Sequence, residues 1–456
     1  MSITFGTDGW RAILEEEFTE RNVSRVTNAI GKYVKDTFGY KKPLLVGYDP
    51  RRCADKYAEH CANILKNKGF DVYLSNKVVP TPVLAYNAQL RNACAIMFTA
   101  SHNPPEYLGM KFIPDYAGPA TSDITNSILD NLDKEFENSN EYGTLHKIDF
   151  FPKYYEHIKN IIDFEVLKKI NTNIIFDGLY SSSIGYFDEI LKKNSINFQS
   201  IHMYHDYDFG GGMPDPKPRF LKELINKVNN TNNAIGLAND GDADRFGIIN
   251  ENGEYVSPNE IISILLKYLI EKGYTGSVVK TVGSSLLINI IGEKLGIDVI
   301  ETPVGFKYVG EAMRKNKVII GGEESGGLSI YGHIPEKDGI LANLLVLETM
   351  AKSGKKLTDL QEEIYKLAGV KFYTDRIDLK LDSQQEISEI LSKVKSLKNI
   401  GKYKITSINT MDGVKFMLGD KTKILIRPSG TEPLLRIYFE SDNIDKLEEL
   451  KAELMI

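Results

Sequence analysis

Short apolar runs that stop at polar turns recur along the chain. Residues 93–98 form such a run, and the turn Thr99-Ala100-Ser101-His102-Asn103-Pro104-Pro105 follows it. An uninterrupted apolar run of this length is typical of a buried strand. Polar side chains at the end of a strand lie where open α/β sheets usually carry their chemistry. Ser101 is therefore a candidate functional hydroxyl, although Ser, Asn and Pro are also ordinary turn residues.

The same plan of strand, polar loop, amphipathic helix and strand occurs three times. The pattern predicts strands at 44–46 and 71–74, at 173–176 and 198–201, and at 278–282 and 298–300. Each repeat is βαβ-like, and three repeats at roughly even intervals favour three related α/β domains. Only the pattern repeats, because the residues themselves differ between the three copies.

The chain changes character after about residue 370. Short alternating strands and two helices predict a smaller α+β domain there, with strands at 372–379, 403–408, 423–426 and 435–439 and helices at 384–398 and 443–454. We therefore expect an α/β protein of three topologically related α/β domains plus a C-terminal α+β domain around a central cleft. The expected boundaries are 1–150, 151–252, 253–368 and 369–456. The glycines and prolines of 206–220 indicate an irregular surface loop.

Composition narrows the possible functions. The chain has 456 residues, of which 42% are hydrophobic and 26% charged, as in a globular protein of several domains. A net charge of -6 argues against nucleic-acid and anionic-membrane partners. We expect no membrane span and no secretory signal, and hence a cytoplasmic protein. Three cysteines without metal spacing, Cys53, Cys61 and Cys94, fit idle thiols in a reducing compartment.

Three carboxylates at alternate positions form the sharpest single motif. Asp240, Asp242 and Asp244 follow an apolar run and are separated by small residues. Two unit charges about 4 Å apart repel by about 4 kcal/mol at an effective dielectric constant near 20, so a divalent cation relieves this loop. Oxygen ligands favour Mg²⁺. An EF-hand would need Gly where Arg245 stands, and a solvated acidic turn is the plain alternative.

Three more polar loops carry candidate chemistry. Gly-Gly-Glu-Glu-Ser-Gly-Gly at 321–327 follows an apolar run, and its glycines allow Glu324 and Ser325 to approach the hydroxyls of a sugar. Arg-Pro-Ser-Gly-Thr-Glu-Pro at 427–433 offers donors for a phosphate. Phe-Gly-Thr-Asp-Gly-Trp-Arg-Ala at 5–12 presents Arg11, whose planar guanidinium suits a phosphate. Each loop, taken alone, is also compatible with an ordinary turn.

Together these motifs resemble one family. FGTDGWRA, TASHNPPEYLGMKF, DGDADR, GEESGG and RPSGTEP occur here in the order of the α-D-phosphohexomutases, which include phosphoglucomutase, phosphomannomutase and phosphoglucosamine mutase. The matches run from residue 5 to residue 433. The resemblance implies that Ser101 carries a phosphoryl group, and that one Mg²⁺ per chain binds Asp240, Asp242, Asp244 and that phosphoserine.

The resemblance also implies roles for the other loops. Arg11, Lys111, His102 and Arg245 would surround the reacting phosphate, with Arg11 and Lys111 as acid/base or transition-state groups. The substrate would be bound by Glu324, Ser325, Lys307, Lys337, Arg427, Ser429, Gly430 and Thr431. The expected reaction interconverts hexose 1-phosphate and hexose 6-phosphate through a 1,6-bisphosphate, with glucose 1,6-bisphosphate as activator. The expected partners are small hexose phosphates, in a monomer or homodimer.

The sequence determines the preferred sugar and the identity of the general base less closely. The Glu-Glu-Ser form of the sugar loop resembles phosphoglucomutases, and phosphomannomutase and phosphoglucosamine mutase are the alternatives. Related bacterial groups carry a histidine two residues after the serine, where this chain has Gly327. Lys111 is then the first candidate base and His333 the second. A metal-dependent sugar phosphatase and a catalytically silent sugar-phosphate-binding relative are the other classes considered.

Overall fold

The computed structural model describes residues 3–6, 8–139, 141–428 and 434–454. They divide into two compact units, Met1–Pro258 with Ser325–Leu360 and Asn259–Glu324 with Gln361–Ile456. The chain therefore passes three times from one unit to the other. Within the described residues, no helix combines the length and apolar character that a membrane crossing requires.

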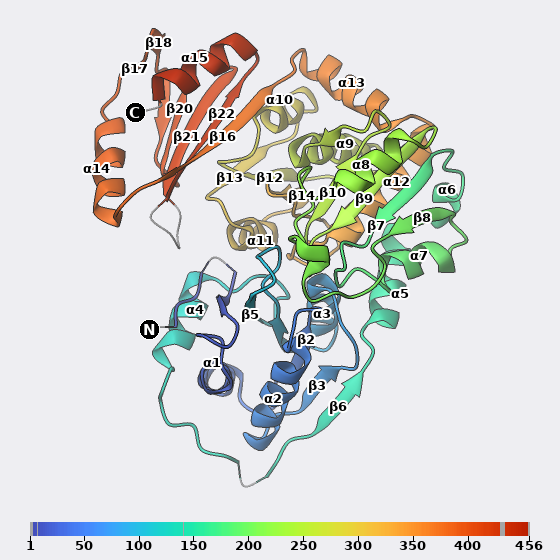
Figure 1. Cartoon of the computed structure of the whole chain (residues 1–456), viewed down its shortest axis with the longest axis vertical. Coiled ribbons are helices and arrows are strands. Elements are labelled where there is room, and N and C mark those ends of the chain that lie inside the picture. Colours follow the sequence, from blue (N-terminus) through green and yellow to red (C-terminus); the bar gives the residue numbers. More distant parts are fainter. Residues whose placement is uncertain (1–2, 7, 140, 429–433, 455–456) are drawn as a thin grey trace. The chain divides into compact units, whose positions relative to one another are not determined.

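The first sheet has the strand order β1-β5-β4-β2-β3-β6. β2, β3, β4 and β6 run parallel, whereas β5 is antiparallel to β4 and to β1. One core joins the sheet to α1, α2 and α4, while α3 packs on β2 and β4 and against α5 (Figure 1). The bounds are β1 (Trp10–Ile13), α1 (Glu20–Phe38), β2 (Leu44–Tyr48), α2 (Ala54–Asn67), β3 (Val72–Ser75), α3 (Thr81–Leu90), β4 (Cys94–Phe98), β5 (Tyr107–Ile113), α4 (Ser122–Asp130), β6 (Leu145–Ile148) and α5 (Phe151–Ile161).

Local sequence explains how the first helix begins and ends. The Thr19 hydroxyl accepts a hydrogen bond from the Asn22 N–H, which caps the N-terminus of α1. Gly39 ends the helix at a φ of 74°, a conformation that favours glycine. Between the two caps, buried apolar residues recur every three or four positions and face the sheet. Helix α1 is therefore specified by its own residues as well as by its packing.

The second sheet has the order β8-β7-β9-β10-β11 and belongs to the same unit. β7 lies between β8 and β9 in parallel, and β10 is antiparallel to β9 and β11. The buried helix α12 contacts β9 and β10. The bounds are α6 (Phe164–Leu167), β7 (Asn173–Asp177), α7 (Phe187–Lys193), β8 (Phe198–Ile201), the 3₁₀ turn η1 (Phe209–Gly211), α8 (Lys222–Asn229), β9 (Ala234–Asn239), β10 (Phe246–Ile249), β11 (Tyr255–Val256), β15 (Leu328–Ile330) and α12 (Gly339–Ser353).

The described residues of the other unit contain two larger sheets and the two-stranded sheet β17-β18. The parallel strands β13-β12-β14 pack against α11, and the antiparallel sheet β16-β22-β21-β20-β19 shares a core with α14 and α15 (Figure 1). The bounds are α9 (Pro258–Glu271), β12 (Ser277–Thr281), α10 (Leu286–Lys294), β13 (Val299–Thr302), α11 (Phe306–Lys315), β14 (Val318–Gly322), α13 (Leu357–Ala368), β16 (Tyr373–Lys380), α14 (Gln384–Val394), β17 (Asn399–Ile400), β18 (Tyr403–Lys404), β19 (Ser407–Asn409), β20 (Val414–Met417), β21 (Thr422–Pro428), β22 (Leu434–Ser441) and α15 (Ile444–Leu454).

Strand order confirms that the three α/β sheets share a topology, as predicted. In each repeat, the first strand lies between the second strand and the strand that follows the repeat in the chain. The three orders are β3-β2-β4, β8-β7-β9 and β13-β12-β14. All three triplets are parallel. Three related α/β domains and a C-terminal α+β domain are therefore confirmed, whereas the cleft and the domain boundaries stay predictions.

Several local expectations need correction. The strand expected at 403–408 is broken into β18 and β19, and β20 and the edge strand β6 were not expected. The loop at 206–220 is irregular, but its residues 214–216 are buried rather than on the surface. The Pro214 carbonyl accepts from the Gly241 N–H at 3.2 Å, so this loop packs against the aspartate loop. Sequence patterns do not contain such long-range contacts.

Candidate active site

Ser101 lies on a strained and tightly held turn after β4. Its φ is 53°, which is unusual for a residue with a side chain. The Thr99 hydroxyl accepts from the Ser101 N–H at 2.8 Å, and the serine is 1% exposed. A costly backbone conformation persists only where the surroundings hold it, and such positions cluster at functional sites. The turn thus fixes the direction of the Ser101 hydroxyl.

Arg51 holds this turn in place through an ion pair and several hydrogen bonds. Its carboxylate partner Asp49 accepts from Nε at 3.2 Å and also from the Thr99 hydroxyl at 2.6 Å. Both charged side chains are buried, and Arg51 then donates to four backbone carbonyls, those of Ser101 (2.8 Å), Asn103 (2.6 Å), Pro104 (2.7 Å) and Tyr107 (3.0 Å). One buried guanidinium thereby satisfies groups that the turn leaves without secondary-structure partners.

The aspartate loop after β9 faces Ser101. Carboxylate oxygens of Asp240, Asp242 and Asp244 lie within 4.8 Å of one another, and all three residues are buried. The Ser101 hydroxyl donates to Asp240 Oδ2 at 2.8 Å. A Cβ at Gly241 would collide with the Ser101 carbonyl oxygen, so the two loops approach too closely for any side chain there.

The donor set fits a hard divalent cation. Asp242 Oδ1 and Asp244 Oδ1 are buried and accept no hydrogen bond, although buried carboxylate oxygens are normally satisfied. Burial and the repulsion from Asp244 and Asp242 raise the pKa of Asp240 well above its ordinary value. Converging carboxylates with unsatisfied oxygens, next to a serine hydroxyl, are what Mg²⁺ takes as ligands. This triad could therefore bind a metal.

Two lysines lie beside the triad. Lys111 Nζ is 2.8 Å from Asp242 Oδ2, 3.0 Å from Asp244 Oδ2 and 2.7 Å from Asp8 Oδ2. Lys337 Nζ is 2.8 Å from Asp244 Oδ2 and 3.4 Å from Asp8 Oδ2. Asp8 thus links both ammonium groups.

These contacts set the charge of the lysines. Burial by itself would lower the pKa of Lys111, but Asp242, Asp244 and Asp8 raise it well above the ordinary range. For Lys337, burial is likewise outweighed by Asp244 and Asp8, so its pKa is raised. Both side chains are charged in this arrangement. Lys111 is therefore suited to stabilising negative charge, and its role as base stays a prediction.

Arg11, His102 and Arg245 also lie near the serine. Arg11 donates to Asn103 Oδ1 at 2.6 Å, and the Arg245 N–H donates to Asp240 Oδ1 at 2.9 Å. His102 Nδ1 is 3.4 Å from the Ser101 hydroxyl oxygen. Burial, then the positive charges of Arg245 and Arg11, lower the pKa of His102 well below its usual value. His102 is therefore neutral, and positive charge near Ser101 comes from arginine and lysine.

His333, the second candidate for the base, is committed elsewhere. Its Nε2 lies 2.9 Å from Asp338 Oδ2, its Nδ1 lies 2.9 Å from His157 Nε2, and its side chain is inaccessible to solvent. Tyr154 also donates to Asp338 Oδ2, at 2.7 Å. Because both ring nitrogens of His333 belong to a buried polar network, the structure does not support that assignment.

The position of Lys337 explains why residue 327 is a glycine. A Cβ at this position would collide with Cδ of Lys337. The lysine side chain therefore occupies the space into which a residue at 327 would project. Lys337 and a side chain at 327 exclude one another, which accounts for the glycine where a histidine was looked for.

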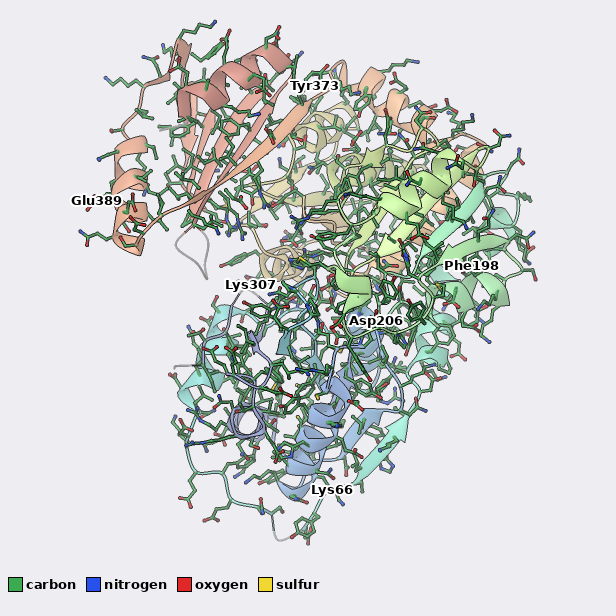
Figure 2. The ribbon with its side chains drawn as sticks, in the orientation of Figure 1. Lys66, Phe198, Asp206, Lys307, Tyr373 and Glu389 are labelled. Atoms are coloured by element: carbon green, nitrogen blue, oxygen red, sulfur yellow. The ribbon has the colours of Figure 1, made fainter. Side chains whose placement is uncertain are left out.

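The sugar and phosphate loops belong mainly to the other unit. Glu324 Oε2 accepts from the Thr281 hydroxyl at 2.6 Å and from the Ser284 hydroxyl at 3.3 Å. Lys307 lies in the first turn of α11 and is half-buried (Figure 2). Arg427, at the end of β21, donates from Nε to Asp412 Oδ2 at 3.0 Å. Ser325 falls in the unit of Ser101.

The predicted phosphate ligands Ser429, Gly430 and Thr431 lie outside the described residues. Sequence reasoning missed three residues of the site as built: Asp8, Arg51 and Thr81. The Thr81 hydroxyl donates to Asp242 Oδ2 at 2.6 Å. Asp8 stands within the FGTDGWRA motif, so its signal was present, and Arg51 follows a strand in Asp-Pro-Arg-Arg. Thr81 carried no signal, because only tertiary folding brings it to the aspartate loop.

Comparison with known protein families shows which family the chain belongs to. Four models of the phosphoglucomutase/phosphomannomutase family match in order, the alpha/beta/alpha domains I, II and III at residues 2–139, 152–253 and 257–368 and the C-terminal domain at 379–456. The chain belongs to this family. It is accordingly an isomerase of carbohydrate metabolism, an intramolecular phosphotransferase of the α-D-phosphohexomutase superfamily.

Individual relatives agree on the family and differ in substrate. Phosphoglucomutase/phosphomannomutase of Thermococcus kodakarensis is 31% identical, over 98% of this chain and 97% of the relative. Phosphoglucosamine mutase of Methanocaldococcus jannaschii is also 31% identical, over 99% and 97%. A solved structure from Thermus thermophilus, described as a "putative phosphomannomutase", has a TM-score of 0.88 at 31% identity and covers 99% and 98%. Similarity at this level does not select one sugar.

Proposed function

We propose that this phosphohexomutase interconverts hexose 1-phosphates and hexose 6-phosphates through a phosphoserine at Ser101 and a hexose 1,6-bisphosphate, and that glucose is its preferred sugar. The observation that carries the proposal is the serine hydroxyl 2.8 Å from a carboxylate of a buried aspartate triad that has unsatisfied oxygens. The choice of glucose rests on the Glu323-Glu324-Ser325 loop, and glucosamine and mannose are the alternatives.

The transfer itself exchanges one oxygen–phosphorus bond for another. The hydroxyl oxygen of a hexose monophosphate bonds to the phosphorus on Ser101, the bond from Ser101 Oγ to phosphorus breaks, and the hydroxyl proton ends on Oγ. Return of the other phosphoryl group reverses these steps. A phosphoserine carries about -1.5 to -2 charges, which must be offset before an oxygen can attack.

The chain's own groups supply much of that offset. Lys111 and Lys337 are held charged beside the triad, and Arg11 lies next to the phosphoserine turn. A Mg²⁺ held by Asp240, Asp242, Asp244 and the phosphoserine would act there as a Lewis acid on phosphoryl oxygens. In the other unit, Glu324 would accept from sugar hydroxyls, Lys307 would lie near the sugar, and Arg427 would help to hold the phosphate that is not reacting.

A ³¹P NMR time course tests the proposal. The protein is supplied with Mg²⁺ and a trace of glucose 1,6-bisphosphate, and glucose 1-phosphate, mannose 1-phosphate and glucosamine 1-phosphate are run separately. We expect a 6-phosphate resonance that grows fastest from glucose 1-phosphate and is absent in Ser101→Ala.

Other outcomes contradict particular parts of the proposal. Faster conversion of mannose or glucosamine 1-phosphate would overturn the choice of sugar and keep the mutase. Inorganic phosphate as the only product would favour a phosphatase, and no change with any substrate would favour a silent binder.

A further inference from the structure

A second cluster of buried charge belongs to the other unit. Lys423 on β21 and Glu440 on β22 are direct neighbours in the C-terminal sheet, 2% exposed each, with Nζ 3.4 Å from Oε2. The proposed reaction assigns neither residue a role. Burying charged groups is costly unless partners compensate, so their partners show what the pair does.

Those partners are backbone groups of the loop between β12 and α10. Glu440 Oε2 accepts from the Leu286 N–H at 3.0 Å, and its Oε1 accepts from the Ser285 hydroxyl. Lys423 donates to the carbonyls of Gly283, at 3.2 Å, and Ser284. Two side chains of the C-terminal sheet therefore bind this part of the third α/β domain through two carbonyls, one N–H group and one hydroxyl.

Lys280 holds the same loop from its other end. It is fully buried at the end of β12 and donates to the carbonyls of Ser284 at 3.2 Å and Ser285 at 3.0 Å. Glu301 Oε2 lies 3.6 Å from Lys280 Nζ and balances part of its charge. Two lysines and one carboxylate thus fix four consecutive residues, 283–286.

The loop at 283–286 also fixes the carboxylate of Glu324. Ser284 and Thr281 both donate to Glu324 Oε2, at 3.3 and 2.6 Å. A Cβ at Gly283 would lie 2.6 Å from Glu324 Oε1, so the loop backbone packs directly against the carboxylate. Any displacement of this loop would therefore move Glu324.

We propose that Lys423 and Glu440 are positioning residues through which the C-terminal domain holds Glu324 in the geometry that selects the sugar. The inference rests on the proposed function, in which Glu324 contacts sugar hydroxyls. The path runs from the Lys423–Glu440 pair to the loop 283–286, and from the loop to the carboxylate. A site that hydrogen-bonds a hydroxyl discriminates by geometry, so loosening its support lowers discrimination.

The test measures sugar selectivity rather than activity alone. The readout is the ratio of kcat/KM for glucose 1-phosphate to that for mannose 1-phosphate, which differ in one hydroxyl. In Lys423→Met and Glu440→Gln we expect this ratio to move towards one by on the order of tenfold. Lys451→Gln is the matched control, because Lys451 pairs with Asp375 at 2.6 Å within the C-terminal domain and should leave the ratio unchanged.

Two further variants separate positioning from general stability. Ser284→Ala removes one hydroxyl from the path and should shift the ratio in the same direction even if Lys423→Met fails to fold. In a Glu324→Gln background, adding Lys423→Met should change the ratio no further, since the pair acts through that carboxylate.

The possible results of these measurements distinguish a failure of the positioning role from a failure of the proposed mutase activity. An unchanged ratio in Ser284→Ala and in a folded Lys423→Met overturns the inference while the mutase stands. A full additional shift in the Glu324→Gln background also overturns it. A wild-type protein that converts neither sugar phosphate overturns the proposed function, and the inference with it.

Discussion

Two clusters of lysines and carboxylates in the described part of the chain differ in composition and in the kinds of partners they have. Around Ser101, the carboxylates of Asp8, Asp240, Asp242 and Asp244 meet the ammonium groups of Lys111 and Lys337. In the other unit, Lys280, Lys415 and Lys423 meet Glu301 and Glu440. Carboxylates outnumber lysines in the first cluster, and lysines outnumber carboxylates in the second.

The decisive difference is whether the charged groups are satisfied within the chain. The first cluster keeps two buried carboxylate oxygens without a donor. In the second, Lys280, Lys423 and Glu440 are saturated by backbone carbonyls, N–H groups and one hydroxyl. Unsatisfied oxygens indicate a place for a ligand, whereas saturation by backbone indicates a structural and positioning role.

Removing a carboxylate from the first cluster should have the largest effect. Asp242→Asn removes a charge that the triad needs to hold a cation, so we expect activity to fall at least about a hundredfold, because several kcal/mol of charge stabilisation are lost. Titration calorimetry with Mn²⁺ and Mg²⁺ should show lost metal binding. Glu301→Gln is the control in the second cluster and should keep the wild-type metal affinity. Wild-type metal affinity in Asp242→Asn would contradict the assignment.

Breaking the second cluster should cost stability. Glu440→Gln leaves Lys423 buried without its counter-charge, and removal of one partner of a buried pair costs about 3–5 kcal/mol. Urea unfolding should report this loss in the free energy of unfolding. Lys451→Gln, which breaks a more exposed pair, should cost far less. Equal losses in both variants would mean that the Lys423–Glu440 pair is no stronger than a surface pair.

Metal should stabilise the first cluster alone. A ligand that binds only the folded state at a hundred times its Kd adds about 2.7 kcal/mol to the free energy of unfolding. We therefore expect Mg²⁺ to raise the Tm of the wild type and of Glu301→Gln, and not that of Asp242→Asn. A shift that survives in Asp242→Asn would place the metal elsewhere.

The pH dependence of stability should show a contribution from Lys280 in the second cluster. Burial, followed by repulsion from Lys423, lowers the pKa of Lys280 to about 7, against about 10.4 in an unfolded chain. Between these values the unfolded chain binds a proton that the folded protein does not, so the free energy of unfolding rises with pH, by at most about 1.4 kcal/mol per unit. Lys280→Met should lose this slope between pH 7 and pH 9. An unchanged slope would mean that Lys280 stays charged in the folded protein.

Much of the fold was predictable because strand and turn signals are local. The strand predicted at 198–201 coincides with β8, and the repeat of βαβ units is confirmed by the strand orders. Strand β20 was missed because Val-Lys-Phe-Met is short and follows a break. The burial of 214–216 was missed because it depends on the aspartate loop.

The candidate site divides in the same way. Ser101 and the aspartates were found because each stands at the end of an apolar run, a position that residue order alone reveals. The role of Lys111 was less accessible, since its charge depends on carboxylates from distant segments. His333 stands in the sequence next to functional residues, yet its side chain is enclosed by Asp338 and His157.

Residue order alone identifies the family, the βαβ repeats and the loops that carry chemistry, because strand periodicity and motif spacing are properties of neighbouring residues. Which charges are satisfied depends on the tertiary structure. Two aspartate oxygens lack donors, while Lys423 and Glu440 are saturated by a loop more than a hundred residues away in the chain. Hydrogen bonding and charge state depend on which groups meet in space, and residue order does not contain that information.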